Sequence, residues 1–376
     1  MKTYKGTPIK NSNIAIGALT DLDDAIPRGN FILYKDKPCF SDFGFSGYIA
    51  KIDAVPPFAK SGVHIDSNAN FYQHIGDIVQ INNDGQINIL WEKKSTQNAL
   101  YLTDTCNVDC VMCPQPQKPH NKIHLKVAHR ILDLLSREEL SHMCITGGEP
   151  TLLKDDFLKI LERCTSEHPR AYINILTNGQ TLSNLDFAKQ CAIRSSHGTC
   201  YCVSMHGDSP VTHDKIVQKN GAFGNVHRSL YNLSKLNVGI EVRFVISKIN
   251  YKRLPNLADF FFRSYPFVHH FALMGLEMTG WASKNSDIVW IDPVDYQREL
   301  EHFVVEAERR GLNFSIYNHQ LCTLPKRAWK HARQSISEWK QNFISACETC
   351  EIQGRCGGFF ATSKDLVSRG INPVRL

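Results

Sequence analysis

Apolar and polar residues follow one pattern up to about residue 97 and a different pattern after it. From about residue 98 to 317, short apolar runs alternate with segments whose apolar residues repeat every three or four positions. The runs predict strands and the segments predict amphipathic helices, an alternation typical of parallel β/α units. We predict six such units, with strands over 98–103, 142–146, 172–177, 201–205, 240–247 and 269–274.

Six β/α units predict an α/β fold, an open partial (β/α)6 barrel over residues 98–317. Val127, Ile131 and Leu134 recur at helical spacing after the first strand, and Pro293 suits the first turn of the helix after the sixth. In barrels of this type the functional site gathers at the carboxyl ends of the strands. We therefore expect the chemistry in the loops that follow the strands.

Residues 1–97 predict a small N-terminal β domain. Turn residues separate short β-type runs, and Asn83-Asp84-Gly85 joins the runs 78–81 and 86–91 as a hairpin. This domain either caps the barrel or docks a substrate or partner, and the sequence does not separate the two. Residues 318–376 form a third region, a cysteine-rich extension.

Composition narrows the class of protein. The 376 residues carry a net charge of +6 without a dense basic block, so a nucleic-acid partner is not favoured. No apolar run reaches the roughly 20 residues of a membrane helix, and the polar amino terminus lacks a signal-peptide core. We therefore expect a cytoplasmic protein without a membrane partner.

The cysteines suggest bound metal. Thirteen cysteines, an odd count without a secretory signal, argue against a disulfide framework. Seven fall into two clusters. The other six are expected to be small, buried apolar residues; they are Cys39, Cys144, Cys164, Cys191, Cys200 and Cys202.

Cys106, Cys110 and Cys113 stand as C-x3-C-x2-C directly after the first predicted strand. A loop this short can bring three thiolates to three corners of an iron-sulfur cube and leave the fourth iron without a protein ligand. Taken alone, the trio also suits half a zinc site or a redox loop.

A second motif, Gly147-Gly148-Glu149-Pro150, follows the second strand. The glycines allow backbone to approach a bound molecule, and the Glu149 carboxylate can accept hydrogen bonds from an ammonium group. Together the motifs resemble the radical S-adenosylmethionine (SAM) superfamily. The resemblance implies a 4Fe-4S cluster on the trio, SAM held by the Gly-Gly-Glu-Pro run, and reductive cleavage of SAM to a 5'-deoxyadenosyl radical. Met112 stands where these enzymes usually have an aromatic residue. A backbone contact with adenine remains possible at Met112, but ring stacking does not.

Residue parity adds polar candidates inside the barrel. In the fifth strand Arg243 and Glu241 share the face opposite the apolar residues, so they should line the lumen. An enclosed Arg243 needs an anionic partner, either the SAM carboxylate or one of Glu241 and Glu149. Ser204 and Asn178 are placed for the ribose hydroxyls, or for internal hydrogen bonds.

The second cysteine cluster is Cys322, Cys347, Cys350 and Cys356. Four thiolates suit a structural zinc or a second 4Fe-4S cluster. The arrangement resembles the shorter auxiliary-cluster extensions of peptide-modifying radical SAM enzymes, and we favour the cluster because the chain already needs iron-sulfur assembly.

Further stretches resemble the radical SAM maturases of the bacterial His-Xaa-Ser peptide-modification system. They are 76–79, 98–103, 112–116, 274–277, 317–322, 332–336 and 356–360. The resemblance implies a ribosomally made precursor peptide as substrate, and a second radical SAM maturase and a small companion protein as partners. An electron donor such as flavodoxin or ferredoxin is also implied.

Other functions remain open on the sequence. The runner-up is a radical SAM enzyme that acts on RNA or a small metabolite, and a different class is a non-catalytic metal-binding scaffold. The scaffold leaves the Gly-Gly-Glu-Pro run unexplained. We assign no catalytic acid or base. The candidates for such a role are polar residues near the fourth and sixth strands, namely His206, His213, His269, His270 and Glu277.

Overall fold

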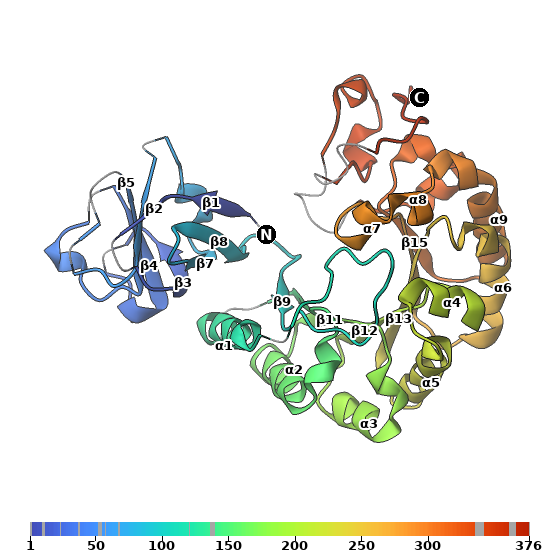
Figure 1. The fold of residues 1–376 in the computed structure, drawn as a ribbon, viewed down its shortest axis with the longest axis horizontal. Coiled ribbons are helices and arrows are strands. Elements are labelled where there is room, and N and C mark those ends of the chain that lie inside the picture. The colour runs from blue at the N-terminus through green and yellow to red at the C-terminus, as the bar shows by residue number, and fades with distance from the viewer. Residues whose placement is uncertain are drawn as a thin grey trace. The chain divides into compact units, whose positions relative to one another are not determined.

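The computed structural model describes most of the chain, in two compact units. The described residues are 2–9, 12–22, 24–36, 38–51, 55–56, 58–66, 68–119, 121–135, 140–334, 342–360 and 366–375. One unit holds residues 1–100 and 122–143, and the other holds 101–121 and 144–376 (Figure 1). Of the stretches that carried the finer resemblance, Ser335 and Ile336 lie outside the described residues.

The first unit is built on a mixed sheet. Its described strands are β1 (Thr3–Lys5), β2 (Thr7–Pro8), β3 (Ala15–Thr20), β4 (Phe31–Lys35), β5 (Gly47–Lys51), β6 (Gly62–Ile65), β7 (Ile78–Ile81) and β8 (Gln86–Trp91), in the order β1-β8-β7-β3-β4-β5-β6-β2. The predicted hairpin is confirmed as the antiparallel pair β7 and β8. Gly85 has φ +81°, and the Asp84 carboxylate accepts the Gln86 N–H, so both residues serve the turn.

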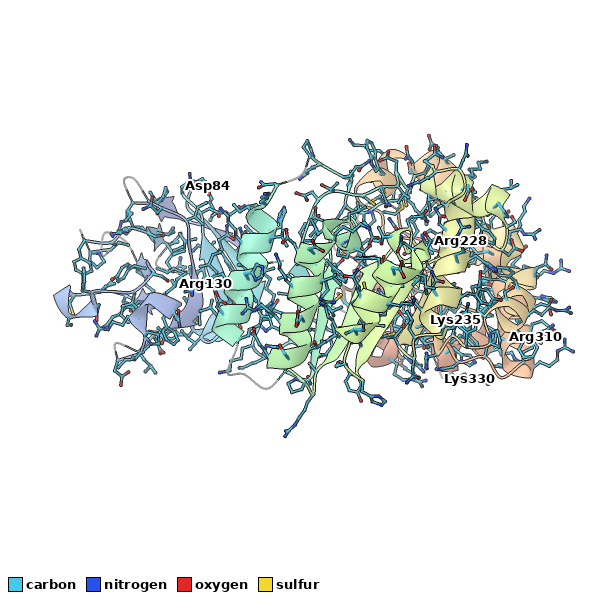
Figure 2. The ribbon with its side chains drawn as sticks, turned by 90° about the horizontal axis from the view of Figure 1, so that it is seen from below. Asp84, Arg130, Arg228, Lys235, Arg310 and Lys330 are labelled. Carbon is cyan, nitrogen blue, oxygen red and sulfur yellow. The ribbon has the colours of Figure 1, made fainter. Side chains whose placement is uncertain are left out.

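Helix α1 (Ile123–Leu135) packs within this unit, although it follows β9 in the chain. Arg130 of α1 donates to the Ile16 carbonyl (3.3 Å), the Gly29 carbonyl (2.9 Å) and the Asn30 side-chain oxygen (3.1 Å) (Figure 2). The helix is therefore joined to β3 and to the turn before β4.

The second sheet is the one that positions the candidate chemistry. Its described strands are β9 (Ala99–Tyr101), β10 (His142–Thr146), β11 (Tyr172–Thr177), β12 (Thr199–Ser204), β13 (Gly239–Val245), β14 (His270–Met274) and β15 (Phe314–Tyr317), in sequential order across the sheet. Pairing from β11 through β15 is parallel. The predicted α/β fold with a parallel sheet is confirmed. The seventh strand, β15, was not predicted, because its four residues are too short to give a clear period and include a serine.

The longer helices follow the outer side of this curved sheet, and the segment 101–119 runs on its inner side (Figure 1). The remaining described helices are α2 (Asp155–Glu167), α3 (Leu185–Ile193), α4 (Pro210–Val217), α5 (Ala222–Ser234), α6 (Leu254–Ser264), α7 (Trp281–Lys284), α8 (Ser286–Val289) and α9 (Gln297–Arg309). Each longer helix is amphipathic; α5 buries Val226 and Leu230 while Arg228 stays exposed, as does Lys235 directly after the helix (Figure 2). None of the helices in the described ranges is both long and apolar enough to cross a bilayer.

Side chains along β13 alternate between buried and half-buried positions. Ile240, Val242 and Phe244 are buried, while the alternate residues Glu241 and Arg243 are half-buried. This alternation agrees with the predicted apolar outer face and polar inner face.

Candidate functional site

The three-cysteine loop leaves β9 and is fixed by backbone hydrogen bonds to the end of α4. Asp109 N–H donates to the Val217 carbonyl (3.1 Å), and Val111 N–H donates to the Ile216 carbonyl (2.9 Å). The Lys219 ammonium donates to the Asn107 carbonyl (3.0 Å). These three hydrogen bonds satisfy backbone groups of a loop without regular structure and tie it to the end of α4.

Met112 belongs to the packing of this loop. Its side chain is 5% exposed and packs with Ile216, Met278, Ala282 and Val289. The neighbouring Cys113 carbonyl accepts the Trp281 N–H at 2.8 Å. The methionine side chain is therefore a core residue in this structure, which suits a role for its backbone rather than its side chain.

The three cysteines of the trio lie near one another and are half-buried. Burial raises the pKa of Cys110, and the nearby Cys113 and Cys106 raise it further. Burial also raises the pKa of Cys106 and of Cys113. The protein alone thus keeps three neighbouring thiols protonated, and a bound cationic centre would release their protons because metal ligands are thiolates.

The Gly-Gly-Glu-Pro loop lies directly against the segment before the cysteines. Gly148 N–H donates to the Thr103 carbonyl (2.7 Å), and Glu149 N–H donates to the Thr105 carbonyl (2.8 Å). A Cβ atom on Gly148 would lie 2.5 Å from the Thr105 carbonyl oxygen. Gly148 is therefore required for the close approach of the two loops.

Glu149 is a fully buried carboxylate that joins three segments. One oxygen accepts hydrogen bonds from the Thr151 N–H and hydroxyl and from the Thr177 hydroxyl, and the other accepts the Asn178 N–H at 2.6 Å. Burial raises the pKa of Glu149, while these donors oppose the rise. The second oxygen carries one of these bonds and has a further lone pair, so it can accept one donor more, such as an ammonium.

Asn178 follows β11 and brings the two motifs together. Its side-chain amide donates to the Cys106 sulfur (3.5 Å) and to the Asn107 side-chain oxygen (2.8 Å). Close by in sequence, the Thr105 hydroxyl is buried without a hydrogen-bond partner among the described residues. A buried polar atom without a partner is consistent with a ligand at this position.

Arg243 lies in a polar network that crosses β13, β14 and β15. Its guanidinium donates to Glu241 (2.6 Å), whose other oxygen contacts His270 Nδ1 (2.7 Å), and His270 Nε2 contacts the Ser315 hydroxyl (3.0 Å). Burial raises the pKa of Glu241, but His270 and Arg243 together lower it to about 2. Glu241 is thus an anionic partner of Arg243. Ser204, the last residue of β12, lies half-buried in register with Arg243.

The sequence missed the part of this network that comes from β15. Ser315 and Tyr317 stand on the same face of that strand, and Tyr317 packs edge-on against His270 at 6.5 Å. Their alternation around Ile316 was the available signal, although four residues are too few to establish it. Of the other histidines, His206, His213 and His269 accept backbone N–H groups, as internally bonded histidines do.

The four carboxyl-terminal cysteines line one small cavity of about 20 Å³ together with apolar side chains such as Phe343 and Ile352. Leu321 N–H donates to the Cys356 sulfur and Val374 N–H to the Cys350 sulfur, both at 3.4 Å. Burial raises the pKa of Cys322, and the nearby Cys356 and Cys347 add to the rise. Four cysteines are residue types that bind zinc or an iron-sulfur cluster, although the four thiols that line this cavity are not arranged around a single metal position.

The described residues contain no group of three or more His, Cys, Asp or Glu side chains arranged as ligands of a metal ion. All thirteen cysteines are free thiols. Of the six single cysteines, Cys164, Cys191 and Cys202 are buried as predicted, and Cys144 and Cys200 are half-buried. The prediction was wrong for Cys39, which is exposed on a turn and contacts the Ser41 hydroxyl at 2.9 Å.

A parallel α/β sheet carries a three-cysteine loop after one strand and a Gly-Gly-Glu-Pro loop after the next, and this combination resembles the radical SAM superfamily. Residues 100–261 match the family model described as Radical SAM superfamily. The similarity to this superfamily therefore concerns these residues, which make up less than half of the chain.

Two curated relatives that the chain resembles carry names of different activities, a cyclase and a maturase. The chain is 29% identical over 168 residues to GTP 3',8-cyclase of Aquifex aeolicus, covering 43% of this chain and 51% of the cyclase. It is 25% identical over 245 residues to mycofactocin maturase MftC of Mycobacterium tuberculosis, covering 63% of this chain and 56% of the maturase. The chain thus spans about half the length of these curated relatives.

A solved structure shares the fold. Streptococcus suis SuiB bound to S-adenosylmethionine aligns with a TM-score of 0.50 and 19% identity, over 61% of this chain and 52% of SuiB. This likeness concerns the fold alone.

Proposed function

We propose that the chain is a radical SAM enzyme whose cluster is held by Cys106, Cys110 and Cys113. The observation that carries the proposal is the junction of the two motifs. The loop of the three thiols and the Gly-Gly-Glu-Pro loop are joined by two backbone hydrogen bonds, and the Asn178 amide reaches from β11 to Cys106. A bound 4Fe-4S cluster supplies the electron that cleaves SAM to methionine and a 5'-deoxyadenosyl radical.

The residues of the chain bind SAM and orient it at the cluster. In this proposal the second oxygen of Glu149 accepts a hydrogen bond from the SAM ammonium, and Gly147 and Gly148 leave room for its methionine end. The backbone at Met112 faces adenine, and Ser204 and Asn178 lie near the ribose. Arg243 contributes positive charge for the SAM carboxylate while Glu241 holds its guanidinium in place.

The first test is metal content and SAM cleavage. After anaerobic purification and reconstitution, we expect iron and sulfide, and release of 5'-deoxyadenosine and methionine from SAM with dithionite. A variant with Cys106, Cys110 and Cys113 changed to alanine should lose both the SAM cleavage and the iron of this site. A protein that contains zinc and releases no 5'-deoxyadenosine is instead a metal-binding scaffold.

For the substrate, we propose a ribosomally made precursor peptide. Support comes from the mycofactocin maturase match, which spans more of the chain than the cyclase match, and from the four-thiol cavity after the barrel. The resemblance to His-Xaa-Ser maturases adds, within this proposal, a second maturase, a small companion protein and an electron donor of the flavodoxin or ferredoxin type.

We further propose that Cys322, Cys347, Cys350 and Cys356 hold an auxiliary 4Fe-4S cluster, with zinc as the alternative. Elemental analysis of the variant that lacks the first trio separates the two, because the remaining metal is then iron or zinc. We also place the reaction in the cytoplasm, where thiols stay reduced.

A small metabolite is the second candidate substrate, and the similarity to GTP 3',8-cyclase favours it over RNA. Co-expression with the small open reading frames beside the gene, followed by mass measurement of each peptide, distinguishes the two. A mass change in one peptide that disappears in the Cys106→Ala variant supports the maturase. Unchanged peptides together with a modified metabolite or RNA would reject it.

A further inference from the structure

We infer that Asn178 tunes the SAM-binding cluster: its amide donates a hydrogen bond to the Cys106 sulfur and thereby raises the reduction potential of the cluster. This inference rests on the proposed function, since it requires a cluster on the three-cysteine loop. It assigns Asn178 a role toward a cluster ligand, in addition to its place near the ribose.

The orientation of the Asn178 amide is fixed by its neighbours. The side-chain oxygen accepts the Gln180 N–H at 2.9 Å, so the NH₂ group must point the other way. One N–H then goes to the Asn107 side-chain oxygen (2.8 Å) and the other to the Cys106 sulfur (3.5 Å). A flipped amide would direct NH₂ at the Gln180 N–H and carbonyl oxygen at Asn107 oxygen, losing all three bonds.

The backbone of Asn178 is fixed as well, because its N–H donates to the buried Glu149 carboxylate at 2.6 Å. Glu149 in turn lies in the loop bound to Thr105, one residue before Cys106. The Asn178 donor and the Cys106 sulfur are therefore held in place by the same hydrogen-bond network. Asn178 acts on the cluster through Cys106 and is a positioning residue.

The physical effect has a definite sign. Cluster reduction adds one electron, from the 2+ to the 1+ state, and no bond forms or breaks. The added charge is shared with the cysteine sulfurs, so an N–H donor stabilises the reduced state more than the oxidised state. Removal of the donor must therefore lower the potential. The effect is strengthened by the lower local dielectric around these half-buried cysteines.

The test is a redox titration of the reconstituted full chain, with dithionite and mediators, followed by electron paramagnetic resonance. The relevant signal is the one that changes when SAM is added, which separates it from any auxiliary cluster. The variants are Asn178→Leu, which keeps the branched shape of the side chain but lacks a donor, and Asn178→Asp, which keeps the acceptor for Gln180. The matched control is Gln180→Ala, which removes a neighbouring side chain bonded to the Ala222 carbonyl (3.1 Å) but leaves its own backbone N–H.

We expect a negative shift in Asn178→Leu, a larger negative shift in Asn178→Asp because of its added charge, and the wild-type potential in Gln180→Ala. A wild-type potential in Asn178→Leu overturns the inference while the proposed function stands. A shift of equal size in Gln180→Ala overturns it too, because loop disturbance then accounts for the change. If Asn178→Leu does not fold, a wild-type potential in Asn178→Asp overturns the inference in its place. Absence of any SAM-responsive iron signal in the wild type rejects the proposed function instead.

Discussion

Gly148→Ala tests whether the two motifs depend on the close approach of their loops. The added Cβ would lie 2.5 Å from the Thr105 carbonyl oxygen and 2.9 Å from the Asp104 carbonyl oxygen. Both are backbone atoms, so no flexible side chain can move aside. Reaching an ordinary contact of about 3.4 Å requires the loops to separate by about 0.9 Å.

That separation would break the hydrogen bonds from Gly148 N–H to Thr103 and from Glu149 N–H to Thr105. Two bonds at about 0.5–1.5 kcal/mol each give about 1–3 kcal/mol. Strain from the inserted methyl group adds about 1–3 kcal/mol. We therefore expect the free energy of unfolding to fall by about 2–6 kcal/mol, together with a loss of iron at the three-cysteine loop.

The assay is urea unfolding followed by circular dichroism, with iron per chain measured on the same preparations. Gly224→Ala is the matched control, because this glycine lies inside α5 with nothing within 4 Å of the added Cβ. Alanine there should stabilise the protein by about 0.5–1 kcal/mol. If Gly148→Ala unfolds at the wild-type urea concentration and retains its iron, the argument for a tight junction is wrong.

Three further predictions concern charge and metal. The pKa of Glu241 falls from 4.5 to about 2 on folding. The contribution of Glu241 to stability is therefore present above about pH 4.5 and is lost as the pH falls toward 2. A Glu241→Gln variant whose acid unfolding curve matches that of the wild type would contradict this. Burial lowers the pKa of His213 to about 4. Its ring should stay neutral at pH 5.5, and a resonance that titrates near 6.5 would refute that. Cys322→Ala should lower metal content while the SAM-responsive signal remains, and an unchanged metal content would argue against the four-thiol site.

Much of the architecture was readable because it depends on local pattern. The hairpin about Asn83-Asp84-Gly85 and the alternation in β13 follow from turn chemistry and a period of two, and both are confirmed. Strand β15 was missed because four residues do not establish a period. Cys39 was misjudged for a related reason: a small apolar residue carries no pattern that tells a core position from an exposed turn.

The sequence by itself determined the α/β class and the two cysteine clusters, since spacing along the chain sets which thiols a short loop can gather. Only the tertiary structure linked Glu241 to His270 and His270 to Ser315, each pair on two neighbouring strands. It also turned the Asn178 amide toward Cys106, a contact between residues 72 positions apart. Such pairings depend on strand order and on the competition among buried polar groups for partners, and neither is encoded in local periodicity.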